Sequence, residues 1–209
     1  MSESSVFGNF FSGHQLEEAV TNTLQKWYPT YLKEAERQYG FQPQTLKIPP
    51  LDAYTTRNTF EFLSSEDFPK VVVISPGTVG TSVLTGSKTY RAIWRLGVGI
   101  ALAADTEEFA NQQARATGAA TRALILQKSS LDGSIKGIVD VSSDGESYDD
   151  IPVQGTKLQL FKSVAMYFMF DIENIVRKYG GPSQPDLDPN RQWPIAETVD
   201  VELEKEAIT

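Results

Sequence analysis

The sequence predicts an α+β fold: a mixed, mainly antiparallel sheet flanked by an N-terminal helix and a central alanine-rich helix. Residues 14–39 repeat apolar side chains every three or four positions, which is typical of an amphipathic helix. Residues 90–104 and 158–176 alternate apolar and polar side chains with a period of two, which indicates strands with one buried face. Residues 106–127, between these strands, show a second helical pattern. Long strands beside one helix predict a sheet with a single covered face, which suits a protein that binds neighbours on its open side.

The composition suits one domain with an arm at each end. For a chain of 209 residues we expect an N-terminal arm over 1–13, an α+β domain over 14–182 and an acidic extended C-terminal arm over 183–209. The sequence contains no run of about twenty apolar residues, so we expect no membrane span. Residues 1–6 do not have the pattern of a signal peptide. The absence of cysteine excludes disulfides and thiolate metal sites. The net charge of −8 argues against a basic groove for nucleic acid.

The N-terminal helix carries one apolar stripe. We expect Pro29 to kink or divide this helix, and Gly40 to end it. Residues 41–60 are rich in proline and have no clear period, so they predict a loop. The stripe consists of Leu16, Val20, Leu24, Trp27, Tyr31, Ala35 and Tyr39.

The middle of the chain predicts a short strand, a connection and a long strand. Residues 70–75 are β-branched and favour a strand. Residues 76–89 contain three glycines and predict a mobile loop or a long hairpin connection. The long strand over 90–104 buries one face and places Arg91 and Arg95 on the other.

The alanine-rich helix is expected to begin at a cap formed by Asp105 or Thr106 and to end near Gln127. Residues 133–152 predict one or two short strands around the dipeptide 144–145, Asp-Gly, which is a hairpin-turn signal. We expect the helix to lie on the sheet through a face of small residues: Ala110, Ala114, Gly118, Ala119 and Ala123.

No motif in the sequence predicts a catalytic centre. His14 is the single histidine, and no nucleophile pattern accompanies it. Residues 80–89 depart from a phosphate-binding loop in spacing, and a strand follows them where such a loop opens a helix. Residues 140–151 resemble half of an EF-hand loop, but Ile151 stands where calcium needs a glutamate. We therefore expect no enzymatic activity, no catalytic residue, no cofactor and no metal site. A small metal-dependent enzyme stays open as the less favoured alternative, with a site built from Asp140, Asp144, Glu146, Asp149 and Asp150.

Four residues are candidates for an interface. Arg91 and Arg95 either face solvent or form bidentate pairs with an acidic surface on a neighbouring subunit. Trp193 and Ile195 are apolar anchors within an acidic, proline-containing segment, and they predict that the C-terminal arm docks on a partner. A disordered tail is the alternative.

Several segments together resemble the tail terminator proteins of long-tailed (siphovirus-type) bacteriophages, especially those of actinobacterial hosts. The resemblance covers roughly residues 15–182. The matching segments are the helix with Trp27 and Tyr31, residues 67–77, residues 90–98, the alanine-rich helix up to residues 131–133, residues 148–151 and a final strand ending at residues 180–182.

The resemblance implies a mixed sheet flanked by helices and a ring, expected to be a hexamer, that stops tail-tube polymerisation and presents the surface to which the neck or head attaches. It implies a virion protein of the tail–neck junction, assembled in the host cytoplasm. The partners would be other copies of the chain, the major tail tube protein and a neck or head-completion protein, with DNA as a passing cargo and no membrane. A different neck connector or head-completion protein stays open as the alternative. A ring needs heterologous interfaces, and an acidic lumen would repel DNA phosphates.

Overall fold

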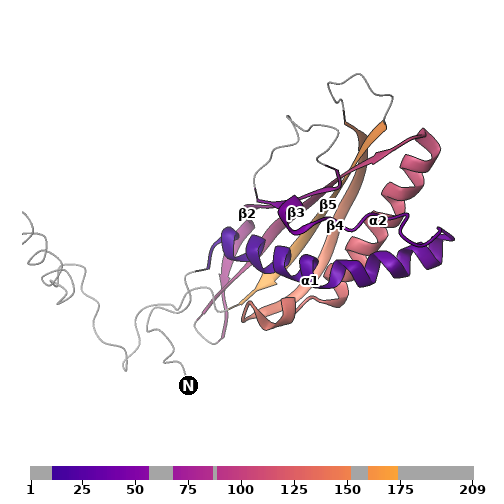
Figure 1. Ribbon diagram of the computed structural model, residues 1–209. Helices are drawn as coiled ribbons and strands as arrows, with labels where there is room; N and C mark the ends of the chain where they lie inside the picture. Colours follow the sequence, from indigo (N-terminus) through magenta and orange to yellow (C-terminus); the bar gives the residue numbers. More distant parts are fainter. Residues whose placement is uncertain (1–10, 57–67, 87–88, 152–159, 174–209) are drawn as a thin grey trace, which may run out of the picture. The chain divides into compact units, whose positions relative to one another are not determined.

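The structure is a computed structural model of the chain (Figure 1). The chain divides into two units, Met1–Lys178 and Tyr179–Thr209, and the second unit lies outside the described residues. The expected C-terminal arm, with Trp193 and Ile195, therefore also lies outside them. The described residues are 11–56, 68–86, 89–151 and 160–173.

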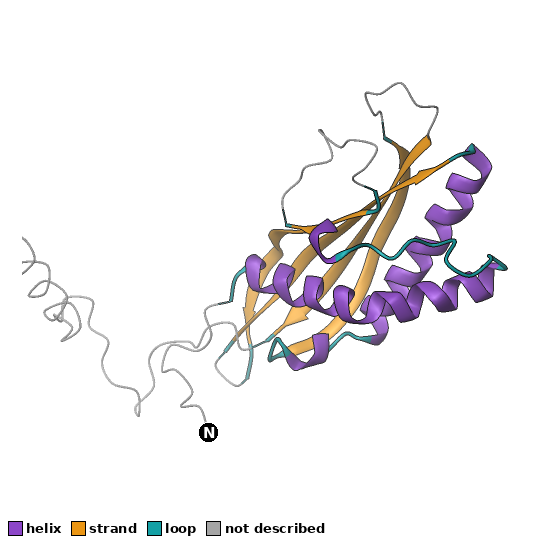
Figure 2. Ribbon diagram, in the orientation of Figure 1, coloured by secondary structure: helices purple, strands orange, loops and turns teal. Residues whose placement is uncertain are grey.

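Five strands form one sheet in the order β1-β2-β3-β5-β4 (Figures 1 and 2). Every neighbouring pair from β2 to β4 is antiparallel, whereas β1 is parallel to β2. The predicted class, α+β with a mixed and mainly antiparallel sheet, is confirmed. The strands are β1 (Tyr54–Thr55), β2 (Lys70–Leu84), β3 (Tyr90–Ala104), β4 (Ile138–Asp150) and β5 (Leu160–Ile172).

The helices α1 (Gly13–Tyr39) and α2 (Glu107–Gln127) cover one face of this sheet (Figure 2). The strand side chains that face them form the core together with the buried sides of both helices. Short 3-10 helices, η1 (Leu51–Ala53) and η3 (Leu131–Gly133), lie in the connections. The strand residues of the core with at most 1% exposure include Val71, Val73, Leu96, Val98, Ile100, Val164, Met166, Phe168, Phe170 and Ile172.

Helix α1 is continuous through Pro29, so the expectation that proline divides it is wrong. Leu24 and Tyr28, before the proline, and Leu32, after it, are all buried in the same core. Packing on both sides of Pro29 compensates for the lost backbone hydrogen bond, which costs on the order of 3 kcal/mol in a helix interior. The helix ends as predicted at Gly40, whose φ of 73° is left-handed.

The buried stripe of α1 also drifts from its predicted course. Tyr28 and Leu32 are buried in the second half of the helix, while the predicted Trp27 and Tyr31 are only partly buried and Tyr39 is exposed. The prediction continued the stripe in steps of three or four residues through Trp27 and Tyr31, whereas the buried positions of the helix are Tyr28 and Leu32. The true buried face includes Tyr28 because its hydroxyl finds a partner inside the core.

Helix α2 has the predicted bounds but a different buried face. Thr106 caps it and accepts a hydrogen bond from the Phe109 backbone N–H. Ala119 and Ala123 are only half-buried, so the predicted phase is wrong in part. Helix α2 packs against both α1 and the sheet, so its buried face is wide and includes polar residues. The buried residues are Ala110, Gln113, Ala114, Ala116, Thr117, Gly118, Ala120, Thr121, Leu124 and Ile125.

Two long stretches predicted as loops or turns are strands, and the predicted loop over residues 41–60 contains the 3-10 helix η1 and the two-residue strand β1. Strand β2 does not end near Ser75 but continues to Leu84, with register shifts between residues 74 and 77 and between residues 79 and 83. Strand β4 runs without a hairpin through the Asp-Gly dipeptide, where the register shifts instead and Gly145 has a φ of 130°. In both strands these glycines lie at the bulges, because a bulge accepts backbone angles that a regular ladder does not.

Candidate interface on the open face of the sheet

The open face of the sheet is the face that no described helix covers. On β3 it includes the odd-numbered positions, which alternate with the core positions. The strand registers then place the following residues on it: Val72, Ile74, Val79 and Val83 of β2; Arg91, Ile93, Arg95, Gly97 and Gly99 of β3; Ser163, Ala165, Tyr167, Met169 and Asp171 of β5; and Asp140, Ser142, Ser147 and Asp149 of β4.

Arg91 forms a bidentate pair with Asp171 on this face. Its Nε donates to Asp171 Oδ1 at 2.6 Å, and its Nη2 donates to Asp171 Oδ2. These hydrogen bonds raise the pKa of the Arg91 guanidinium, and the nearby carboxylates of Glu173 and Asp140 raise it further. The pair fixes the Arg91 side chain across β3 and β5.

Arg95 is also bonded within the chain. Its Nη2 lies 2.9 Å from Asp144 Oδ2, and its guanidinium lies 5.0 Å from the centre of the Tyr167 ring, which is a cation–π contact. Both predicted interface arginines thus share the open face, and each has a carboxylate partner on another strand. The partner of Arg91 is on the neighbouring β5, and the partner of Arg95 is on β4, beyond β5. The predicted binding of these arginines to a neighbouring subunit stays a prediction. A carboxylate of the neighbour would have to share each arginine with its present partner or replace that partner.

The carboxylates of β4 do not converge on one point. Asp144 reaches Arg95 on the open face, whereas Glu146 pairs with Arg122 of α2. Asp150 pairs with Lys162 on the helix-covered side, at 2.5 Å between Oδ1 and Nζ. In the described part of the chain no group of three or more His, Cys, Asp or Glu side chains is placed to hold a metal ion. The five carboxylates of the alternative enzyme therefore lie on two faces, with three of them in ion pairs.

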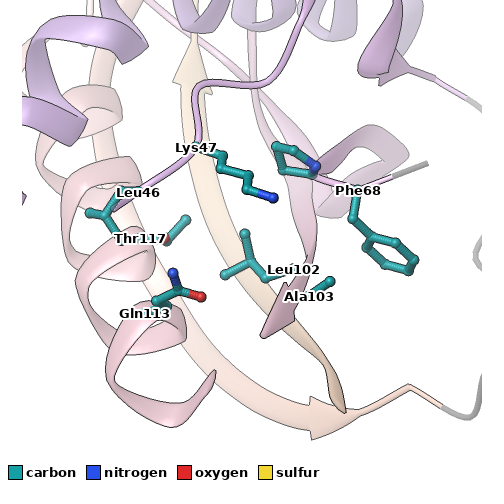
Figure 3. Close-up of a pocket in the computed structure, with 8 residues that line it drawn as sticks. Leu46, Lys47, Phe68, Leu102, Ala103, Gln113 and Thr117 are labelled. Atoms are coloured by element: carbon teal, nitrogen blue, oxygen red, sulfur yellow. The ribbon is translucent and has the colours of Figure 1, made fainter. Parts of the chain in front are cut away.

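Two hollows among the described residues adjoin the sheet. On the open face, Gly97 and Gly99 leave an apolar groove of about 360 Å³ beside Tyr167. A second hollow, of only about 20 Å³, lies between residues 46–47, Leu102 and α2 (Figure 3). That space is of the order of one water molecule. Neither hollow gathers a nucleophile and a base.

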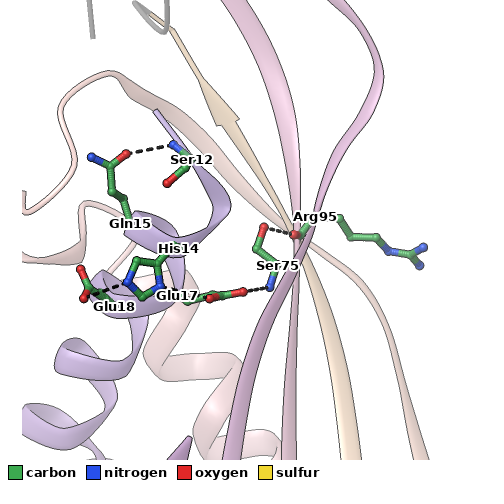
Figure 4. A network of polar contacts seen from close by, with 7 residues as sticks. All are labelled: Ser12, His14, Gln15, Glu17, Glu18, Ser75 and Arg95. Carbon is green, nitrogen blue, oxygen red and sulfur yellow. Dashed lines mark hydrogen bonds and ion pairs between the residues drawn. The ribbon is translucent and has the colours of Figure 1, made fainter. Parts of the chain in front are cut away.

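A polar network ties the start of α1 to β2 (Figure 4). Glu17 Oε1 accepts a hydrogen bond from the Ser75 backbone N–H at 2.7 Å, and Ser75 Oγ donates to the Arg95 carbonyl oxygen at 2.9 Å. Gly13 packs closely here, since a Cβ at this position would lie 3.0 Å from Ser75 Oγ and would press against the Ser75 side chain. His14 lies in this network between the carboxylates of Glu17 and Glu18 and is mostly exposed.

The two lateral edges of the sheet differ in chemistry. Among the described residues, no strand pairs with the outer side of β4 or with the outer side of β2 beyond β1, that is, over residues 77–84. We refer to residues 77–84 as distal β2. Distal β2 contains no charged residue, whereas β4 contains five carboxylates and no basic residue.

Neither a protein-family model nor a curated protein matches this chain. The phage resemblance therefore depends on the sequence segments that carry it. Within the described residues, no helix combines the length and the apolar character that a membrane crossing needs.

The partners Asp171, Asp144 and Tyr167 were missed by the sequence reasoning. The available signal was opposite charge on one open face: the alternation of residues 158–176 puts Asp171 on the polar side of its strand, but the order of the strands does not follow from this alternation. Trp193 and Ile195 lie outside the described residues, so their predicted docking role stays a prediction.

Proposed function

We propose that the protein is a structural virion protein of the tail-terminator type. It forms a ring, expected to be a hexamer, that caps the tail tube, stops tube polymerisation and provides the surface that joins the tail to the neck or head. One observation supports this beyond the sequence resemblance: the open face of the sheet is acidic, while the opposite face is covered by α1 and α2.

The charges of the open face suit a conduit for DNA. Arg91 and Arg95 are each engaged by a carboxylate of the same chain. Asp140, Asp149 and Glu173 form no ion pair with a described residue, so they add negative charge beyond these two pairs. Lys70, opposite Ala101, lies on the same face and offsets one of these three charges, so the face keeps a net negative charge. A ring whose copies turn their open faces inward therefore has an acidic lumen, and an acidic lumen repels the phosphates of a passing duplex.

The two lateral edges of the sheet suit a ring as well. A closed cyclic assembly joins one surface of each copy to a different surface of the next. The uncharged distal β2 and the acidic β4 are such different surfaces at opposite sides of one sheet. The copy number of six comes from the resemblance.

The test is a tube-capping experiment with the major tail tube protein of the same virion. Gold-labelled chain is added to polymerising tubes, and the tubes are viewed by negative-stain electron microscopy. We expect label at one end of each tube and shorter tubes as the concentration of the chain rises. Label along the whole tube, or no label on tubes, contradicts the proposal. Label on neck or head particles but not on tubes favours the alternative of another neck connector or a head-completion protein.

A separate experiment addresses the metal-dependent alternative. Calcium and magnesium are titrated into the full chain by calorimetry, with Asp144→Asn as the matched variant. The proposal predicts no specific binding of either ion. Binding that Asp144→Asn abolishes, together with hydrolase, nuclease or transferase activity, would favour the enzyme instead.

A further inference from the structure

We propose that neighbouring copies of this chain join edge to edge, with β4 of one copy paired antiparallel to distal β2 of the next, so that one sheet continues from copy to copy. The proposal deepens the ring described above and rests on it. Its partner is a second copy of the chain, and its bonds are backbone hydrogen bonds.

Both edges have the groups that such a joint needs. Strand β4 extends over 13 residues, and only its side toward β5 is paired among the described residues. Distal β2 is paired on its β3 side alone within the same part of the chain. A long edge strand presents a row of unpaired N–H and C=O groups and is a template for another strand.

The strand directions favour this joint. Each neighbouring pair in the series β2, β3, β5, β4 is antiparallel. The series has an even number of strands, so β4 runs opposite to β2. Copies related by rotation about a ring axis keep their strands in the same sense. The β2 strand of the next copy therefore runs opposite to β4, and the alternation continues across the joint. An odd number of strands would force a parallel joint.

Charge decides between the possible joints. Pairing β4 with β4 of another copy would bring the carboxylates of β4 toward one another, and like charges across a strand pair are destabilising. Distal β2 brings no charge to the joint. Its open-face valines, Val79 and Val83, are 40% and 61% exposed, and this edge lacks the charged residues that usually protect an edge strand.

Distal β2 is also ordered within the single chain, because it pairs with β3 at residues 77–79 and 83–84. The Ser75 backbone N–H is bonded to Glu17 of α1, directly before the bulge that leads into distal β2. An edge that is already ordered loses less conformational entropy on pairing.

The registers predict where the strands meet. Gly77, Arg95, Met169 and Ser142 lie in one row across the sheet. A rotated copy without axial shift places its distal β2 beside residues 138–142 at the start of β4, with Val79 opposite Asp140. Strand tilt in a closed sheet shifts this register, so the test covers both halves of β4.

The chain has no cysteine, so introduced cysteines report on the joint alone. Full-length variants carry Val79→Cys with Ser142→Cys, or Val79→Cys with Ser147→Cys. The two β4 positions are about 17 Å apart at ~3.4 Å per residue, so for any register between them one lies within about 9 Å of Val79 measured along the strand. Without axial shift Val79 faces Asp140, and Ser142 is then two residues away along β4. A bis-maleimide of roughly 10 Å span is added to assembled tails, since cross-strand and diagonal neighbours lie within about 8 Å. The exposed Ser130→Cys, paired with Val79→Cys, is the control away from both edges.

We expect the paired variants to give a ladder of covalent multimers on a denaturing gel, and the control pair to give none. A matched charge test uses the exposed Val83 in the Val79→Cys with Ser147→Cys pair. In the registers that this pair reports, Val83 lies beside the carboxylates Asp144 and Glu146, so Val83→Glu should lower the cross-linked fraction about fivefold relative to Val83→Lys. Covalent dimers from Val79→Cys alone or Ser147→Cys alone would overturn the proposal in favour of a symmetric joint. Rings at the tube end without a ladder would also overturn it, and the proposed function would stand. A ladder from chains that do not bind tubes would support the joint and contradict the proposed function.

Discussion

The Tyr28 hydroxyl lies 2.7 Å from Thr121 Oγ1, and this hydrogen bond joins α1 to α2 inside the core. Thr121 donates its own hydroxyl hydrogen to the Thr117 carbonyl oxygen at 2.8 Å, so Tyr28 is the donor to Thr121. Both side chains have no exposed surface. A buried polar chain of this kind is stabilising only while each member keeps its partner.

The direction of this hydrogen bond predicts unequal costs for removing its two ends. Thr121→Val leaves the buried Tyr28 hydroxyl without an acceptor and should cost about 1–3 kcal/mol. Tyr28→Phe leaves Thr121 bonded to Thr117 and should cost about 0.5–1.5 kcal/mol. Urea unfolding of both variants and of the double variant measures the difference, and the double variant should cost less than the sum. A larger cost for Tyr28→Phe than for Thr121→Val would reverse the assigned direction.

The stability of the protein should fall in alkaline solution. Burial raises the pKa of Tyr28 and of Tyr54 in the folded state. The unfolded chain ionises these tyrosines near pH 10, so their neutral form favours folding fully below that pH and loses the advantage as the pH rises above it. The free energy of unfolding between pH 8 and pH 11 measures the effect. Tyr28→Phe should make the decline shallower; an unchanged slope in this variant would show that Tyr28 is not buried as described.

The phase of α2 predicts a contrast between two alanines. Ala116 is fully buried, while Ala119 is half-buried. Ala116→Leu should overpack the core and cost about 1–3 kcal/mol, whereas Ala119→Leu should change stability by less than about 0.5 kcal/mol. Thermal unfolding of the pair measures the contrast. Equal costs, or a larger cost at Ala119, would show that Ala119 is buried, as the pattern of small residues in the sequence predicted.

The network at the start of α1 predicts a role for the Glu17 carboxylate. Glu17→Ala removes the acceptor for the part-buried Ser75 N–H and should cost about 1–3 kcal/mol. Glu17→Gln keeps a carbonyl oxygen in the same place and should cost less. Amide hydrogen exchange gives a local readout, because exchange at Ser75 should accelerate in Glu17→Ala and stay slow in Glu17→Gln. Slow exchange in both variants would mean that another group satisfies this N–H.

The sequence predicted the elements whose patterns are simple. Strand β3 has the predicted bounds because its apolar residues alternate without interruption from Ala92 to Leu102. The two helices were also predicted within a residue at each end. The failures occur where local signals compete with tertiary pairing. Pro76 and Gly77 indicate a loop in isolation, yet pairing with β3 carries β2 past them through a bulge.

The candidate interface was predicted only in part. The period of β3 was enough to place Arg91 and Arg95 on one face. Their partners could not be predicted, because Asp171 is 80 residues from Arg91 and meets it only through the strand order and register.

The most direct test of the proposal that this chain caps the tail tube is a cryo-electron microscopy reconstruction of the virion tail at its head-proximal end. We expect a single ring of this chain there, with six copies, with open sheet faces toward the lumen and with α1 and α2 outward. A map with one copy, or with copies distributed along the whole tail, would contradict the claim that this protein caps the tube.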